Sequence, residues 1–462
     1  MVRQVVTGRA ADLLPPGTTG EIKGPTERDQ LHSEISRRLT ALLGGFKDFN
    51  ILTTSLDWQP QLAQKIALPG PESLSLSLDI GDLSRLKAFR EAVEDANNNV
   101  SSTAAVLGVG ADLSLAESEY FCPASVDQLL FGDRSDAAAM TNAGLLRQRN
   151  LTGQGVNIVV IDQGFNAAGV SHFGGGLVNI NNGVQPGATK RGHGPMMVRN
   201  IVDAAPDATF YDVPLIPLRI SDVSGFIGDA LGVFTQLKQL IDVLRQYPTS
   251  NGPWILVNAW SIFDRSTEHP LGDYTENPHH PLNRLIDQMV DDGIDIIFAA
   301  GNCGQYCPDI RCGERDVGPG HSIYGANSHR RVLTTGAVRT DAIWLGRSSQ
   351  GPGQPRLSRW KPDLCAPSNF REVGDASLGN LSEPFVGDTG SPYIASTGTS
   401  AACGLTAGIV GAIRSGWNQT ILPPDKLRYL LNQKARKTEG PHWNERLGHG
   451  IIDVEAALAA LP

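Results

Sequence analysis

The stretch Ala395-Ser396-Thr397-Gly398-Thr399-Ser400-Ala401-Ala402 passes directly from a polar turn into an apolar segment. Downstream of it, small and apolar residues recur at the spacing of one helix face, at Ala402, Leu405, Ile409, Val410 and Ile413. This pattern predicts a buried helix that begins at or just after Ser400. A hydroxyl group there faces the positive helix end, beside backbone N–H groups without an intrahelical partner. That position suits a serine whose attack on a carbonyl group produces an oxyanion, although a lone Gly-Thr-Ser is more often a helix N-cap.

The composition is typical of a globular protein and limits the kinds of partner. The 462 residues suffice for one large domain with a sizeable core and a smaller second domain. Hydrophobic residues make up 40% of the chain and charged residues 19%, which is the ordinary balance of a soluble protein. A net charge of −9 argues against nucleic acid or an anionic membrane as the main partner.

The first residues do not have the pattern of a targeting segment. Residues 1–16 contain Arg3 but no continuous apolar core after it, so no secretory signal peptide is expected. No apolar run approaches the roughly 20 residues that a membrane-spanning helix needs. These patterns predict a cytoplasmic protein, unless it is secreted by a route that the sequence does not reveal.

Three of the six cysteines, Cys303, Cys307 and Cys312, lie close together in the sequence. A zinc site would need two close pairs or added histidines at set spacing, and His321 is a weak candidate, so no metal is assigned. A Cys307–Cys312 disulfide is expected if the compartment is oxidising, and free thiols if it is not.

Residues 1–115 differ in pattern from the remainder and form a candidate N-terminal region before a main domain over 116–462. The first 28 residues are rich in Gly, Pro and Thr and are expected to be poorly ordered. The spacing of apolar residues predicts a helix, a half-buried strand, a second helix and a second strand, over 31–43, 73–80, 82–97 and 104–109. The sequence therefore predicts a small α+β unit here.

From about residue 120, strands and helices alternate. Continuous apolar runs, as expected for strands buried on both faces, predict strands over 156–161, 208–213, 254–260, 294–300 and 331–338. Helical spacing predicts helices over 233–244, 282–290, 424–436 and 454–461, besides the helix at Ser400. Strands that alternate with helices predict an α/β fold of three layers with a mainly parallel central sheet.

Reactive side chains follow three of the predicted strands. Asp162 comes directly after the strand at 156–161, Ser261 follows the next buried strand, and Asn302 follows Ala299-Ala300-Gly301. In open parallel sheets, functional residues gather at the carboxyl ends of the strands. We therefore expect these side chains to lie near one another at one edge of the sheet.

Four short motifs, taken in order, resemble the subtilisin-like serine protease family (subtilases, peptidase S8). They are Asp162-Gln163-Gly164, Gly192-His193-Gly194, Ala299-Ala300-Gly301-Asn302 and Gly398-Thr399-Ser400. The segments 151–156, 361–367 and 448–453 are also similar to family segments, so the resemblance covers about residues 120–462. It implies the three-layer subtilisin-like fold, with the order Asp, His, Ser in its triad.

The resemblance implies a serine endopeptidase that acts through an acyl-enzyme. Asp162 would orient and stabilise the imidazole of His193, which would take the proton of Ser400 and later give it to the leaving amine. Asn302 would donate its amide to the oxyanion, with the backbone N–H of Ser400. Taken singly, each residue is more often a turn former, a loop histidine or a helix cap. Their joint order at strand ends favours the catalytic interpretation.

The resemblance also implies where a protein or peptide substrate binds. An extended peptide would pair beside Ser261, Ile262 and Phe263, and the pocket for the residue before the cut would lie between them and Ala299, Ala300 and Gly301. Phe263 stands where many subtilases have glycine and places a large ring at the pocket edge. An apolar or small residue before the cut is therefore expected.

Several positions depart from the family pattern. Pro195 replaces a usual threonine, Ala401 a usual methionine, and Gly404 a typical proline. These changes touch packing around the triad and predict altered efficiency without loss of activity. Calcium sites are common in the family, but no acidic loop here is assignable to one, and no cofactor is expected to be required.

Two questions stay open at this point. The N-terminal region is either a propeptide that docks on the catalytic cleft or a permanent accessory domain, and the missing signal peptide favours the second. The chain is either an active peptidase or a catalytically silent subtilase fold that binds peptides, and the intact triad favours the first.

Overall fold

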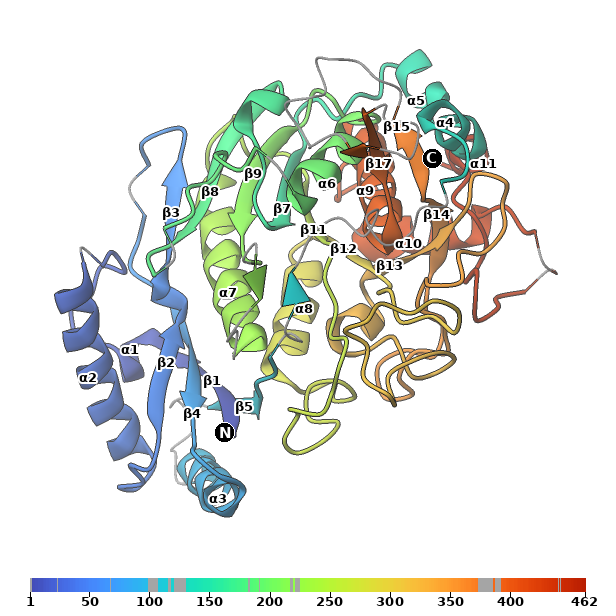
Figure 1. Cartoon of the computed structure of the whole chain (residues 1–462). Coiled ribbons are helices and arrows are strands. Elements are labelled where there is room, and N and C mark those ends of the chain that lie inside the picture. Colours follow the sequence, from blue (N-terminus) through green and yellow to red (C-terminus); the bar gives the residue numbers. More distant parts are fainter. Residues whose placement is uncertain are drawn as a thin grey trace.

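An eight-stranded sheet forms the middle layer of the molecule (Figure 1). The structure, a computed structural model, describes all residues except 1, 23, 67, 99–106, 115–117, 120–129, 182, 191, 217–218, 221–224, 373–384, 387–391, 439 and 441. Across the sheet the strands follow the order β14-β13-β12-β11-β7-β9-β8-β3. In that order their bounds are Leu364–Pro367, Leu333–Val338, Asp295–Ala299, Trp254–Asn258, Asn157–Asp162, Thr209–Pro214, His172–Asn179 and Trp58–Leu62.

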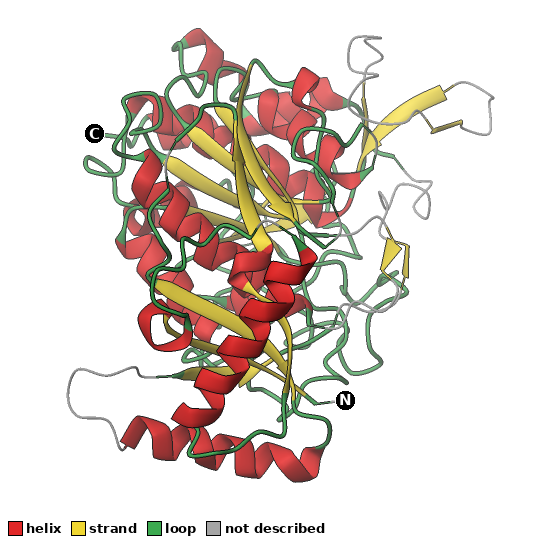
Figure 2. Ribbon diagram, turned by 90° about the vertical axis from the view of Figure 1, so that its left-hand side faces the viewer, coloured by secondary structure: helices red, strands yellow, loops and turns green. Residues whose placement is uncertain are grey.

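The strands from β14 to β8 pair in parallel, and β3 runs antiparallel to β8 at one edge. Parallel strands need helical crossovers, which cover both faces of the sheet (Figure 2). The helices are α1 (Ala10–Leu13), α2 (Pro25–Leu42), α3 (Leu83–Asn98), α4 (Arg134–Thr141), α5 (Gly144–Gln148), α6 (His193–Val202), α7 (Phe226–Leu244), α8 (Pro281–Asp291), α9 (Gly398–Gly416), α10 (Pro424–Lys434) and α11 (Val454–Leu458). The predicted three-layer α/β fold is confirmed.

Neighbouring residues of one strand face opposite helix layers. In β7, Val159 and Ile161 pack into the core beneath α7 and α8, whereas Ile158 and Val160 pack into the core beneath α6 and α9. Because both sets are apolar, the sequence of the strand is one continuous hydrophobic run. The predicted strands and helices of the main domain are confirmed with shifted ends. For example, α7 begins at Phe226, seven residues before its predicted start.

The N-terminal region contains a four-stranded antiparallel sheet of order β2-β4-β1-β5, with α2 and α3 on its outer side (Figure 1). The strands are Asn50–Thr54, Ser73–Asp79, Arg3–Arg9 and Gly108–Ala111. The expected strand over 104–109 is β5, which begins at Gly108; residues 104–106 lie outside the described part of the chain. The other predicted elements here are confirmed.

Two predictions for this region were wrong. The described residues among the first 28 are not poorly ordered, because β1 is a central strand whose Val6 packs beneath the outer helices and whose Val5 packs toward α7. The strand at 73–80 is not half-buried, because Ser75 and Ser77 on its second face are also buried, against α7. The backbone of α7 comes close at Gly228, where an added Cβ would lie 2.7 Å from the Cβ of Ser77. The small serines permit this close approach.

Two small sheets complete the strand topology. Ser118–Glu119 (β6) pairs antiparallel with Arg219–Ile220 (β10), so the chain just after the N-terminal region lies beside the segment just before α7. Pro392–Ser396 (β17) pairs antiparallel with Phe370–Glu372 (β15) on one side and with Phe385–Val386 (β16) on the other. The strand β17 leads directly into α9, which carries Ser400.

Candidate active site

The structure places the reactive side chains at the carboxyl edge of the sheet. Asp162 is the last residue of β7, and Asn302 follows the end of β12 by three residues. Ser261 likewise follows the end of β11. Since β12, β11 and β7 are adjacent and parallel, these residues lie at the same edge, as predicted.

The imidazole of His193 is bound to the carboxylate of Asp162. Its Nδ1 lies 2.8 Å from one carboxylate oxygen and 2.9 Å from the other. His193 is the first residue of α6, and its backbone N–H donates to the side-chain oxygen of Gln163 at 2.9 Å. Gly194 is required beside it, because a Cβ there would lie 2.1 Å from the carbonyl oxygen of Gly164. Backbone and side chain of His193 are thus both fixed to the end of β7.

Ser400 lies in the first turn of α9, as the sequence predicted to within two residues. This helix packs against α6 through glycines: a Cβ on Gly404 would lie 2.8 Å from the Cβ of Asn200, and one on Gly408 would lie 2.6 Å from the carbonyl oxygen of Ile201. Gly404 therefore permits close helix contact, which outweighs the helix propensity that glycine loses. The helix that begins with His193 and the helix that begins near Ser400 lie side by side.

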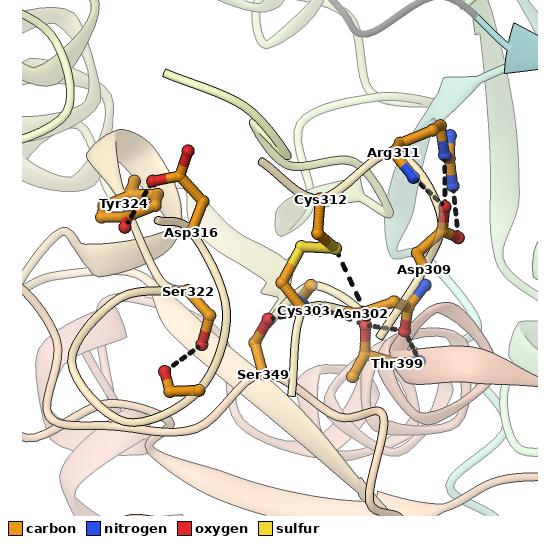
Figure 3. Close-up of a disulfide and its surroundings, with 12 residues drawn as sticks. Asn302, Cys303, Asp309, Arg311, Cys312, Asp316, Ser322, Tyr324, Ser349 and Thr399 are labelled. Atoms are coloured by element: carbon orange, nitrogen blue, oxygen red, sulfur yellow. Dashed lines mark hydrogen bonds and ion pairs between the residues drawn. A yellow bond between two sulfur atoms is a disulfide. The ribbon is translucent and has the colours of Figure 1, made fainter. Parts of the chain in front are cut away.

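Asn302 is oriented by the residue before Ser400. Its side-chain oxygen accepts hydrogen bonds from the backbone N–H of Thr399 at 3.0 Å and from the Thr399 hydroxyl at 3.1 Å (Figure 3). The same hydroxyl oxygen accepts the N–H of Gly301 at 3.1 Å. Because Thr399 binds the amide oxygen of Asn302, the amide nitrogen points away from Thr399.

The predicted walls of the substrate pocket lie next to each other. A Cβ on Gly301 would lie 3.0 Å from the hydroxyl oxygen of Ser261. The amide of Asn327 donates to the carbonyl oxygens of Trp260 and Ala299, at 2.8 Å each, and so joins the two walls. Asn327 could not be found from a sequence motif, because its partners are distant in the chain.

Phe263 is not an open ring at the pocket edge. The guanidinium group of Arg311 lies 4.0 Å from the ring centroid and covers it, and Phe263 is 4% exposed. Arg311 also donates to Asp309 through Nε at 2.8 Å and Nη2 at 2.9 Å (Figure 3). Burial alone would raise the pKa of Asp309, but Arg311 keeps it below its usual value. The paired charges add no net charge to this wall.

A disulfide joins Cys303 to Cys312, directly after Asn302 (Figure 3). The expected Cys307–Cys312 pairing was therefore wrong: Cys307 is a free, exposed thiol. The ring of residues 303–312 folds back on Asn302, whose carbonyl oxygen accepts the N–H of Asp309 at 2.9 Å. This fold-back brings Cys312, and not Cys307, within reach of Cys303.

Two residues that sequence reasoning missed hold the turn before Ser400. The hydroxyl of Ser368 donates to the carbonyl oxygen of Gly398 at 2.7 Å, and the side-chain oxygen of Asn369 accepts the N–H of Gly398 at 3.1 Å. Asn369 has a φ of 55°, a conformation that asparagine tolerates better than most residues. The Ser-Asn pair directly after the resembling segment 361–367 was the available signal.

Asp212, in β9, is a buried carboxyl group near Asp162. One of its oxygens accepts the N–H of Gly187 at 2.7 Å and that of Phe165 at 3.2 Å. Burial raises the pKa of Asp212 to about 7 in spite of these hydrogen bonds, and the charge of Asp162 adds to the rise. Asp212 is thus protonated over much of the acidic range.

The Asp212→Asn variant is expected to lose one component of the pH dependence of stability. A carboxyl group whose pKa is raised on folding stabilises the folded state below its unfolded pKa of about 4. That stabilisation is lost as the pH rises through the folded pKa of about 7. The free energy of unfolding of the wild type should therefore fall relative to the variant over this window, as measured by urea denaturation. Parallel pH profiles would contradict the raised pKa.

Within the described residues, no group of three or more His, Cys, Asp or Glu side chains is arranged to hold a metal ion. Nor does that part of the chain contain a helix long and apolar enough to cross a membrane.

Solved structures of MycP1 are similar in fold to this chain. The crystal structure of MycP1 from Mycobacterium smegmatis is 20% identical and covers 75% of this chain and 89% of that chain, with a TM-score of 0.49. A structure of the serine protease MycP1, an essential component of the type VII (ESX-1) secretion system, is 18% identical over 75% and 92% of the two chains, with a TM-score of 0.51. MycP1 with its N-terminal propeptide removed is 21% identical over 70% and 96%, with a TM-score of 0.48.

No curated protein matches this sequence. The model of the subtilase family (peptidase S8) matches residues 153–450, a span that contains the end of β7 with Asp162, the start of α6 with His193 and the first turn of α9 with Ser400. This match spans more than half of the 462 residues, and the chain therefore belongs to the subtilase family and is a serine-type peptidase.

Proposed function

We propose that this peptidase is an endopeptidase that cleaves peptide bonds through an acyl-enzyme, with Asp162, His193 and Ser400 as its triad. The observation that carries the proposal is the contact of the His193 ring with the Asp162 carboxylate, at 2.8 and 2.9 Å. The helix of Ser400 packs against the helix that this histidine begins. The order Asp, His, Ser along the chain is that of subtilisin.

The chemistry follows from the proton positions that this contact favours. A proton on Nδ1 of His193 is held by Asp162, so Nε2 carries no proton and accepts the hydroxyl proton of Ser400 as its oxygen attacks the scissile carbonyl. His193 then gives that proton to the departing amine, and an acyl-enzyme ester remains. Water adds to the ester by the same route, with His193 again as base, and the acid product leaves.

The negative charge on the carbonyl oxygen needs donors during both attacks. The backbone N–H of Ser400 lies in the first turn of α9, where N–H groups have no intrahelical partner. The amide nitrogen of Asn302 is the second donor, because its oxygen is engaged by Thr399. Two fixed donors in a dry site stabilise the oxyanion without reorganisation.

Replacing Asn302 by alanine is expected to lower kcat by about 10²–10³ with little change in KM, as for the matching asparagine of subtilisin. The Asn302→Asp variant keeps an oxygen for Thr399 but lacks the donor, so it should lose as much. Steady-state kinetics on a peptide amide measure both. A fully active Asn302→Asp enzyme would show that Asn302 acts by holding Thr399 alone.

For the substrate, we propose an apolar or small residue before the cut. The walls built from Ser261 to Phe263 and from Ala299 to Gly301 carry no charged side chain, and Arg311 over Phe263 is neutralised by Asp309. A peptide-library profile dominated by arginine or lysine at this position would contradict the assignment.

Labelling with a fluorophosphonate probe distinguishes an active peptidase from a silent peptide-binding fold. Such a probe reacts with an activated serine, so peptide mapping of the labelled wild type should find the adduct on Ser400. A Ser400→Ala sample gives the background. A silent fold would bind peptides but remain unlabelled in both samples, and that result would overturn the proposal.

We propose further that the N-terminal region docks on the catalytic domain and covers its site. Ser118–Glu119, just after this region, pairs with Arg219–Ile220 as an added strand, and His193 and Ser400 are 1% and 3% exposed in the uncut chain. A propeptide is cut by the enzyme itself, whereas an accessory domain stays joined. Mass spectrometry of wild type against Ser400→Ala should show a cut near residues 110–125 in the wild type alone if the region is a propeptide.

A further inference from the structure

A buried cluster of charged and polar groups lies between the helix of His193 and the strand that leads to Ser400. At its centre is Glu372, the last residue of β15, whose side chain is 1% exposed. Arg134 donates to its carboxylate through Nε at 2.5 Å and Nη2 at 2.6 Å, and the Nε of Arg199 lies 3.0 Å from it. The hydroxyl of Ser396 also donates to this carboxylate.

The partners of Glu372 come from the elements that carry the proposed triad. Arg199 belongs to α6, six residues after His193, and Ser396 ends β17, four residues before Ser400. Arg199 also donates to the carbonyl oxygen of Ala395 at 3.2 Å. One carboxylate therefore connects the histidine helix with the strand of the nucleophile.

A second path runs through Asn200, the neighbour of Arg199 on α6. Its amide donates to the Ser396 hydroxyl oxygen at 3.1 Å, and its side-chain oxygen accepts from Arg134 at 2.9 Å. The backbone just before Arg134 also bonds to β15, because the N–H of Arg371 donates to the carbonyl oxygen of Gly132 at 3.0 Å. The cluster thus forms a closed network and not a single ion pair.

The surroundings of Glu372 favour its ionised, carboxylate form. Burial alone would raise its pKa, but the guanidinium groups of Arg199 and Arg134 hold the pKa below the usual value of a glutamate. A buried carboxylate with two guanidinium partners is costly to disturb, because removal of its charge takes from Arg199 and Arg134 the anion that they share and leaves Arg134 with the carboxylate of Asp203, 3.4 Å away. Fully satisfied networks of this kind rigidify the segments they connect.

We propose that Glu372 is a positioning residue that fixes the end of β17, and hence Ser400, against the start of α6, and hence His193. The proposal rests on the triad assignment above, and it adds the reason that the two helices keep one alignment. Small errors of alignment matter, since a misplacement of about 1 Å costs about 10²-fold in rate. Loss of the network should therefore reduce reactivity by about 10- to 100-fold.

A matched control lies at the other end of α9, the helix that carries Ser400. Arg414, in the last turn of α9, donates to Asp295 through Nε at 2.6 Å and Nη2 at 2.7 Å, and this pair is also buried. Asp295 is the first residue of β12, and the Asp295→Asn variant removes the buried counter-ion of Arg414 far along α9 from Ser400, as Glu372→Gln removes a buried carboxylate charge beside β17. Both variants should lower the melting temperature.

The experiment compares wild type, Glu372→Gln and Asp295→Asn, well below the melting temperature of each. The first readout is the rate of fluorophosphonate labelling of Ser400, and the second is hydrogen–deuterium exchange of the amides in 193–200 and 395–400. Glu372→Gln should be labelled about 10- to 100-fold more slowly and should exchange faster in both segments, whereas Asp295→Asn should match the wild type in both readouts. The Ser396→Ala variant, which keeps every charge paired, should show the same changes to a smaller extent and replaces Glu372→Gln if that protein does not fold.

Each outcome decides the inference. Equal labelling rates and equal exchange in Glu372→Gln and wild type would overturn it, and so would equal changes in Glu372→Gln and Asp295→Asn, which would indicate a general loss of stability. If the wild type itself is not labelled, the proposed function fails. The exchange data then still decide whether Glu372 fixes the two segments, because they do not depend on catalysis.

Discussion

The His193→Ala variant is expected to lose about 10⁶-fold in kcat. The loss follows because His193 is the base proposed for the hydroxyl of Ser400, and the matching substitution in subtilisin has an effect of this size. The side chain is buried and contacts Asp162, and an alanine removes its imidazole. The residual rate is measured by assays with long incubation times on a peptide amide substrate.

A second buried histidine supplies the control for this substitution. His280 accepts the N–H of Leu282 at the start of α8 through Nδ1 at 3.2 Å, and burial lowers its pKa to about 4, so it is neutral near pH 7. His280→Ala should lower the melting temperature and leave kcat within a few-fold of the wild type. A His193→Ala enzyme that retained about 1% of the wild-type kcat would contradict the role of His193 as the base.

The Asp162→Asn variant is expected to lose about 10⁴-fold in kcat with a nearly unchanged KM. An asparagine fits the same space but offers its N–H₂ group to Nδ1, which favours the tautomer that carries its proton on Nε2. In that tautomer Nε2 cannot accept the proton of Ser400. The residual activity should reflect the oxyanion donors and substrate binding, which the substitution leaves intact.

Asp212→Asn is the matched control for Asp162→Asn, since both replace a buried carboxyl group by its amide within the same pair of adjacent strands. Asp212 bonds to backbone N–H groups and not to His193. The kcat of Asp212→Asn should therefore stay close to that of the wild type. A similar loss in both variants would mean that any change of charge near β7 disturbs the site, and the specific role of Asp162 would be lost.

Much of the main domain could be predicted because its strands are apolar on both faces. Such runs, as in 156–161, have a strong pattern that does not depend on the rest of the fold. The strand β8 was not predicted because its sequence, His172–Asn179, is rich in glycine. Its apolar residues follow neither the two-residue period of a strand nor the 3.6-residue period of a helix. The serines of β4 were assigned to solvent because the helix that covers them, α7, comes about 150 residues later.

The candidate site was predictable where a motif sits at a strand or helix end. Asp162, Asn302 and Ser400 belong to this class, and the structure places each at its predicted end. The residues that hold them were not predictable, because Asn327 and Glu372 acquire partners only through tertiary contacts. The disulfide was mispredicted for the same reason: a pairing depends on which sulfur atoms approach in space, and sequence spacing does not determine that.

The antiparallel strand β3 has a consequence for what a cut after the N-terminal region would release. This strand, Trp58–Leu62, belongs to the N-terminal region but pairs with β8 as the last member of the central sheet, and Trp58 is buried in the core of the main domain. A nicked chain would therefore persist as a tight two-fragment complex that elutes as a single particle in gel filtration. The two fragments would separate only in denaturant. The shorter fragment would stay bound as a subunit after the peptide bond between them was cleaved.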